Sequence, residues 1–225
     1  QALVVPGPAR VSLGSGYAQA SCLELFEENL RDYSALLPIA FDEPPEKLRH
    51  LRLHNGVIWR WNRPLIGFDD GNAPHFRIEH RILPAGPSLV DMIANAALYL
   101  GLARHLALGS ANGDGGLPFE SARANFYAAA RDGLAARLRW PGVGEIGARE
   151  LLSDRVLPAA RRGLSDFGLD AQEFLDIVEA RIHSGQTGAA WQRAAFEAHG
   201  RSHYELMAAY CERQRSGAPA HEWEL

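Results

Sequence analysis

Apolar side chains near the start of the chain recur with the spacing of one helical face. Between Ser21 and Leu37 the pattern comprises Leu23, Phe26, Leu30, Tyr33 and Leu37. Side chains three and four residues apart lie on the same side of an α-helix. Because proline cannot continue a helix, the pattern predicts a helix over residues 21–37 that stops at Pro38.

Alternating apolar and polar residues follow, and they predict strands at His50–His54, Val57–Asn62 and His75–Leu83. The first two are separated by Asn55-Gly56, a pair that tolerates positive φ and is typical of a two-residue hairpin. Residues 70–72, Asp-Gly-Asn, are suited to a turn between the second and third strands. We therefore expect an antiparallel meander in this part of the chain.

The pattern becomes helical after residue 87. Ser88 is suited to cap a helix, and Asp91 would lie in the first turn, where the helix dipole favours negative charge. This helix should run to about Leu108. Further helices are predicted between glycine and proline breakers, at Phe119–Leu138, Ala148–Phe167, Ala171–His183 and Ala189–Arg215.

A small sheet followed by helices predicts an α+β fold. The glycine-rich segment 109–116 is expected to be a flexible loop and a hinge. It separates a sheet-containing portion, residues 1–108, from a helical portion, residues 117–225.

Composition narrows the class of protein. A chain with 47% hydrophobic and 22% charged residues is globular rather than disordered, and a net charge of -4 without a basic block argues against nucleic-acid binding. The longest apolar run, Ala96–Leu108, is too short for a membrane span and contains Arg104 and His105. Cys22 and Cys211 have no zinc or disulfide spacing, so we expect a reducing, cytoplasmic setting.

Positive charge is carried almost entirely by arginine, since Lys47 is the only lysine. The planar guanidinium suits carboxylates and phosphates, although a GC-rich genome explains the same bias. The apolar helix faces fit either a domain core or a subunit interface, so a homo-oligomer stays open.

The strand predicted at residues 75–83 carries its charge on one face. Side chains alternate along a strand, so Arg77, Glu79 and Arg81 share a side, opposite to Phe76 and Ile78. One interpretation is an ordinary sheet whose solvated face bears weak cross-strand ion pairs. The other is a nucleotide–metal site, because Glu ligates Mg²⁺ and Arg neutralises phosphate oxygens. The pattern fits both.

Other candidate features favour structural interpretations. His199 and His203 are four residues apart, but they lack the glutamate of a zinc-binding HExxH helix, so we predict helix-surface residues. Aromatic side chains usually bury, which predicts core positions for Trp59, Trp61, Trp140 and Trp191.

Three segments occur in a distinctive order. His54–Pro64 (HNGVIWRWNRP) is rich in aromatic residues and ends in Arg-Pro, Phe76–Arg81 (FRIEHR) contains Glu-x-Arg, and Leu83–Pro87 (LPAGP) leads into a helix. Together they resemble the C-terminal core of the glutamate-cysteine ligase family, including its carboxylate-amine ligase branch. Residues 122–134 (ARANFYAAARDGL) and 185–192 (GQTGAAWQ) are similar to later segments of that family. The resemblance spans about residues 50–195.

The resemblance implies a glutamine-synthetase-like half-barrel of antiparallel strands whose concave face holds Mg²⁺, ATP and amino-acid substrates. Glu79 matches a Mg²⁺ ligand of the family, and Arg81 matches a residue expected near the nucleotide phosphates or the acyl-phosphate. Arg63 matches a clamp for a carboxylate or phosphate. The remaining expected cofactor-binding residues are Arg77, Asn125 and Arg131.

The implied reaction is ATP-dependent ligation. ATP phosphorylates the side-chain carboxylate of glutamate, and the amine of cysteine, or another amine, attacks the acyl-phosphate. With cysteine the product is γ-glutamylcysteine, which implies a role in glutathione biosynthesis. Such chemistry needs metal ions and cations around the phosphates but no covalent protein nucleophile.

One departure from the family pattern matters. The family site also uses acidic residues on earlier strands, and no such motif precedes Glu79. The chain opens at Gln1 in a loop-like stretch, so we expect a C-terminal fragment whose missing N-terminal half supplies those ligands. The alternative is a non-catalytic or partner-dependent interaction module derived from the same fold.

Overall fold

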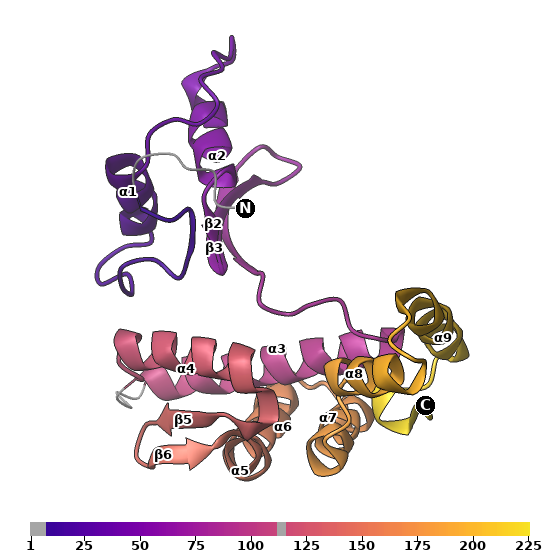
Figure 1. The fold of residues 1–225 in the computed structure, drawn as a ribbon. Coiled ribbons are helices and arrows are strands. Elements are labelled where there is room, and N and C mark those ends of the chain that lie inside the picture. The colour runs from indigo at the N-terminus through magenta and orange to yellow at the C-terminus, as the bar shows by residue number, and fades with distance from the viewer. Residues whose placement is uncertain (1–7, 112–115) are drawn as a thin grey trace. The chain divides into compact units, whose positions relative to one another are not determined.

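The computed structural model describes residues 8–111 and 116–225 (Figure 1). The chain divides into two compact units, the first ending at Pro84 and the second beginning at Ala85. Helix and strand are both present, the sheets are small, and the second unit is mainly helical, which confirms the α+β class. Residues 112–115 of the predicted hinge loop lie outside the described residues, and residues 109–111 belong to a helix.

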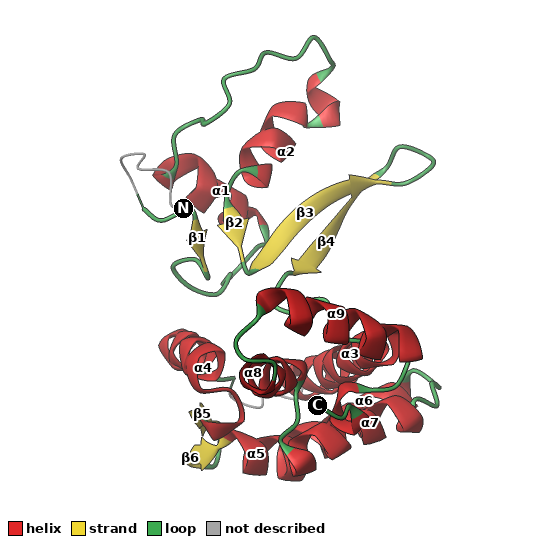
Figure 2. Cartoon of the chain, turned by 45° about the vertical axis from the view of Figure 1, so that its right-hand side comes forward, coloured by secondary structure: helices red, strands yellow, loops and turns green. Residues whose placement is uncertain are grey.

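The first unit combines short helices with two pairs of strands. Its elements are β1 (Val11–Ser12), α1 (Leu23–Asp32), a 3₁₀ turn (Pro45–Lys47), α2 (Arg49–Gly56), β2 (Trp59–Arg60), β3 (Asn62–Phe68) and β4 (Pro74–His80). β1 pairs in parallel with β2, and β3 pairs antiparallel with β4 in a long hairpin (Figure 2). The turn predicted at residues 70–72 is confirmed as the end of this hairpin, where Asp69 Oδ1 accepts a hydrogen bond from the Ala73 amide at 2.7 Å.

The helix predicted at residues 21–37 is present but ends at Asp32. Tyr33 has an extended backbone, and its hydroxyl donates a hydrogen bond of 3.1 Å to the carbonyl of Ala9. The apolar spacing continues past the end of the helix because Tyr33 packs through this tertiary contact. The pattern therefore located the helix but not its end.

The strand predicted at His50–His54 is wrong, because these residues lie within α2. The predicted hairpin at Asn55-Gly56 is also wrong. Asn55 is buried, accepts a hydrogen bond from Asn29 Nδ2 at 3.0 Å and donates one of 2.7 Å to the carbonyl of Pro64. Since a buried amide needs such partners, these bonds fix Asn55 in the interior rather than at a turn.

The second unit contains most of the helices. Its elements are α3 (Leu89–Ala111), α4 (Phe119–Asp132), a 3₁₀ turn (Gly133–Ala135), β5 (Arg137–Trp140), β6 (Gly144–Gly147), α5 (Ala148–Leu151), a π-helical turn (Leu152–Val156), α6 (Leu157–Asp166), α7 (Gln172–Ser184), α8 (Gly188–Ala198), α9 (His203–Ser216) and a 3₁₀ turn (Ala220–Glu222). β5 and β6 form an antiparallel pair.

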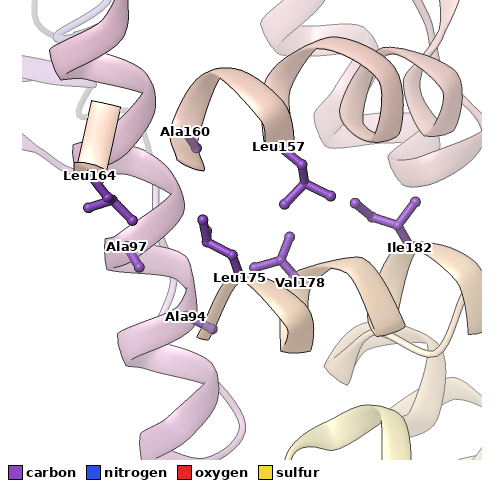
Figure 3. Close-up of a cluster of buried hydrophobic side chains, with 8 residues drawn as sticks. All are labelled: Ala94, Ala97, Leu157, Ala160, Leu164, Leu175, Val178 and Ile182. Atoms are coloured by element: carbon purple, nitrogen blue, oxygen red, sulfur yellow. The ribbon is translucent and has the colours of Figure 1, made fainter. Parts of the chain in front are cut away.

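The core of the second unit lies where α3, α6 and α7 meet (Figure 3). Its buried side chains are Ala94, Ala97, Leu157, Ala160, Leu164, Leu175, Val178 and Ile182. Small residues let α3 and α6 approach closely: a Cβ added at Gly163 would overlap the carbonyl oxygen of Gly101. Among the described residues, no helix is long and apolar enough to cross a membrane.

Local capping signals located α3 well. Ser88 Oγ accepts a hydrogen bond of 3.3 Å from the Asp91 amide and donates one of 2.8 Å to the Asp91 carboxylate, as its predicted capping role requires. The helices predicted at Ala148–Phe167 and Ala171–His183 are also present, although the first contains a π-helical turn.

Of the helices predicted in the second unit, one ends early and another is divided in two. The helix predicted at Phe119–Leu138 stops at Asp132, because Gly133 has positive φ and the chain then enters β5. The helix predicted at Ala189–Arg215 is two helices, separated where Gly200 has positive φ. His199 therefore lies in the turn after α8, whereas His203 begins α9, so the two residues do not have the spacing of a helical zinc site.

Candidate functional site

The β3–β4 hairpin brings together three residues that the sequence singled out. The register places Arg63 directly opposite Glu79, and side chains of directly opposed residues lie on the same face of a sheet. Arg81 follows two residues after Glu79, where the Arg81 amide still donates to the carbonyl of Trp61 at 2.9 Å. The alternation along the strand therefore directs Arg63, Glu79 and Arg81 to one side.

Both arginines bind the same carboxylate oxygen. Glu79 Oε2 accepts hydrogen bonds from Arg63 Nε at 2.8 Å and from Arg81 Nε at 2.6 Å. Arg63 also donates to the carbonyl of Gly56 at 3.1 Å. We call Arg63, Glu79 and Arg81 the Glu79 cluster. The Arg63–Glu79 ion pair is the cross-strand pair expected for a charged sheet face, and Arg81 adds a second pair from just beyond the end of β4.

The Glu79 cluster retains an excess of positive charge. The hydrogen bond from Arg81, followed by the charges of Arg63 and Arg81, lowers the pKa of the Glu79 carboxyl, so this group stays ionised at neutral pH. Two guanidiniums then face one carboxylate, and the cluster carries one net positive charge. It is therefore suited to an anion.

A hollow of about 350 Å³ adjoins the Glu79 cluster. It is lined by Val11, Trp59, Arg60, Trp61 and Arg81. The Arg81 guanidinium lies 4.8 Å from the centre of the Trp59 ring system, so Arg81 belongs to both the cluster and the hollow.

The tryptophans do not share one environment. Trp59 is 57% exposed, so its predicted core position is wrong, whereas the prediction for Trp191, 1% exposed, is confirmed. Trp61 and Trp140 are half-buried.

Arg60 belongs to a separate buried network that sequence reasoning missed. Its guanidinium donates to Glu28 and to Ser12 Oγ at 2.7 Å each and to Asn29 at 3.1 Å. Glu28 neutralises the charge of Arg60, and the network joins α1 to β1 and β2. The Arg60 side chain is therefore a structural support for the hollow rather than a free cation.

Arg77 lies on the same face of β4 as Glu79 but outside the Glu79 cluster. It is paired in register with Leu65 and is exposed, and a Cβ added at Gly67 would come within 2.9 Å of its guanidinium. The guanidinium thus extends across the backbone of β3. Arg77 adds positive charge on the face that carries Arg63.

Asn125 and Arg131, predicted as cofactor-binding residues, lie on α4 in the second unit and have local partners. Asn125 Nδ2 donates to the carbonyl of Arg139 at 2.7 Å, and Asn125 Oδ1 accepts from the Arg139 amide at 2.8 Å. Arg131 forms an ion pair with Asp132 at 2.8 Å and is largely exposed. The amide of Asn125 thus ties α4 to β5.

The described residues do not form a complete Mg²⁺ site. Mg²⁺ prefers octahedral oxygen ligands and often combines one or two carboxylates with phosphates and water. Within residues 8–111 and 116–225 no group of three or more His, Cys, Asp or Glu side chains lies together in a metal-binding arrangement. Glu79 fits as one carboxylate ligand, and its neighbours Arg63 and Arg81 fit phosphate oxygens rather than the metal.

Comparison of the chain with protein-family models, with curated proteins and with solved structures finds no match.

Proposed function

We propose that the chain is the C-terminal part of an ATP-dependent carboxylate-amine ligase of the glutamate-cysteine ligase kind. The supporting observation is the position of Arg81, which binds Glu79, contacts Trp59 and lines the hollow. Arg81, which the family resemblance assigns to the phosphates, is thus the residue shared by the Glu79 cluster and the hollow.

Each residue of the proposed site has a chemical task. Arg81 and Arg63 bind oxygens of the transferring phosphoryl group or of the carboxylate that receives it, where guanidiniums stabilise developing negative charge. Arg77 raises the local positive potential and attracts the nucleotide. Glu79 holds the two arginines in place and offers its carboxylate to Mg²⁺, which when bound neutralises phosphate charge and keeps the reacting groups in line.

The proposed reaction has two steps. The γ-phosphoryl group of ATP moves to the side-chain carboxylate of glutamate, which releases ADP and leaves an acyl-phosphate. The amine of cysteine, or of another acceptor, then forms the C–N bond at the acyl carbon as phosphate departs, and the amine loses a proton. Binding and orientation by cations account for this chemistry without a protein nucleophile.

The proposal requires further acidic ligands. We propose that they come from a preceding part of the same protein, whose strands would extend the β3–β4 hairpin into the half-barrel. Phe76 and Ile78 on the other face of β4 are 61% and 54% exposed within this chain, as expected for a surface that awaits further packing.

One observation favours the alternative of a non-catalytic interaction module. Glu79 is engaged by two arginines, and the described residues hold no carboxylate cluster that would complete a metal site. In that case the Glu79 cluster would be a structural ion-pair network, and the exposed side of β4 would be a partner surface.

The test is ADP release by the N-terminally extended protein in the presence of Mg²⁺, ATP, glutamate and cysteine. We expect release that depends on both amino acids and falls at least about a hundredfold in Glu79→Gln, since the variant loses a metal ligand and the counter-ion of two arginines. Glu145→Gln is the matched control, because the Glu145 ion pair with Arg137 is exposed and lies in the second unit. Absence of amino-acid-dependent ADP release would contradict the ligase and favour the interaction module. Full activity of Glu79→Gln would contradict the role assigned to the Glu79 cluster.

A further inference from the structure

The hollow beside Trp59 has a shape and a charge distribution that the family resemblance does not address. We propose that it seats the heteroaromatic base of the nucleotide, with the phosphate groups bound by Arg81 and Arg63. This inference rests on the proposed function and assigns one part of the site to one part of ATP.

The size and the lining of the hollow suit a flat apolar ring. Its volume of about 350 Å³ is near the lower end of the range for small-molecule pockets, so it holds a base more readily than a whole nucleotide. Val11, Trp59 and Trp61 provide apolar walls. A planar ring buried here would gain both apolar contact and stacking.

Trp59 is held rigidly although its side chain is exposed. Its backbone amide donates a hydrogen bond of 2.7 Å to the carbonyl of Arg10, and β2 pairs with Val11 and Ser12 of β1. The Arg81 guanidinium, 4.8 Å from the ring centre, restrains the indole itself. An indole restrained in this way and 57% exposed loses little entropy when a ring stacks on it. Exposed aromatic side chains of this kind are the usual stacking surfaces for nucleobases.

The charged residues around the hollow indicate where the anionic end of the ligand would bind. The Arg60 guanidinium is neutralised by Glu28 and uses its donors within the protein. Arg81 instead belongs to the Glu79 cluster, which has one net positive charge. The hollow is therefore apolar inside and cationic at its Arg81 side.

Only one reactant of the proposed ligation matches this arrangement. Glutamate and cysteine have anionic groups but no ring, whereas ATP joins a flat heteroaromatic base to a polyphosphate. We therefore assign the base to the Trp59 side and the phosphates to the side of Arg81 and Arg63.

The test compares two ligands that share the polyphosphate but differ in the base. Binding of Mg²⁺-ATP and of Mg²⁺-triphosphate to the N-terminally extended protein is measured by titration calorimetry for wild type, Trp59→Leu and Trp59→Phe. We expect Trp59→Leu to weaken ATP binding about tenfold but triphosphate binding less than about twofold, because only ATP has a ring to stack. Trp59→Phe should restore most of the ATP affinity.

Tyr204→Leu is the control for removal of an exposed aromatic side chain, since Tyr204 is 79% exposed on α9. It should leave both affinities unchanged. Circular dichroism verifies that each variant is folded.

The possible failures differ in meaning. If Trp59→Leu lowered the affinities for ATP and for triphosphate equally, Trp59 would act only by positioning Arg81. If it lowered neither affinity, the base would bind elsewhere. Each result overturns the inference and leaves the proposed function standing. A wild-type protein that binds neither ligand would overturn both.

Discussion

At the residue scale, the candidate site is centred on Glu79, because one of its carboxylate oxygens accepts hydrogen bonds from Arg63 of β3 and from Arg81, just after β4. Residue-level reasoning from the alternation of side chains correctly placed Glu79 and Arg81 on one face, and the register of the hairpin added Arg63. The exposure of Trp59 was missed, because burial depends on contacts between distant segments that no local pattern contains.

The lowered pKa of Glu79 predicts a specific dependence of stability on pH. A carboxyl whose pKa is lowered by folding stabilises the protein above its ordinary value of about 4.5, and this contribution is lost as the pH falls through the lower, folded-state value. Urea unfolding of wild type and Glu79→Gln should therefore differ more at pH 7 than at pH 3. A difference in unfolding free energy between the two proteins that stays constant, or becomes larger as the pH falls, would contradict this contribution of Glu79.

At the level of elements, the sequence predicted those helix ends that are set by hydrogen bonds between residues close together in the chain. The cap formed by Ser88 and Asp91 located the start of α3. The sequence of α2 alternates like a strand, but Asn55 at its end binds Asn29 and Pro64 from other elements. Because these partners are distant in sequence, the pattern did not indicate the helix.

The close crossing of α3 and α6 is expected to be sensitive to a single methyl group. Gly163→Ala should destabilise the second unit by about 1–3 kcal/mol, since the added Cβ would force the helices apart at Gly101. Gly147→Ala is the matched control, because a Cβ at Gly147 meets no atom within 4 Å and its φ is negative. Urea unfolding followed by circular dichroism measures both. Equal stability of the two variants would contradict the close crossing.

At the scale of the whole molecule, two compact units are joined at Pro84 and Ala85. Near the end of the chain, Ala220 and Trp223 form a second buried cluster of the helical unit with Trp191 and Ala195 of α8. Trp223 packs edge-on against Trp191, with ring centres 5.1 Å apart, and Gln186 donates to the Trp223 carbonyl at 2.8 Å. The C-terminal segment is thus an integral part of the helical unit.

Removal of the Trp223 side chain should therefore strongly destabilise the second unit. Trp223→Ala is expected to lower the free energy of unfolding by about 3–5 kcal/mol, because the Trp223 side chain is 4% exposed. Leu225→Ala, at a position that is 61% exposed, should change it by less than about 0.5 kcal/mol. Thermal unfolding of the two variants measures both changes. If the C-terminal segment were only loosely attached, Trp223→Ala would change the stability as little as Leu225→Ala does.

The central claim is that the Glu79 cluster participates in forming an acyl-phosphate. Hydroxylamine traps such an intermediate, because its nitrogen attacks the acyl carbon and phosphate leaves. The N-terminally extended protein, incubated with glutamate, Mg²⁺-ATP and hydroxylamine, should produce glutamyl hydroxamate without any cysteine. Arg81→Met should reduce the yield at least about a hundredfold, whereas Arg137→Met, which removes an exposed arginine of the second unit, should not. No hydroxamate from the wild-type protein, or equal yields from the two variants, would contradict the claim.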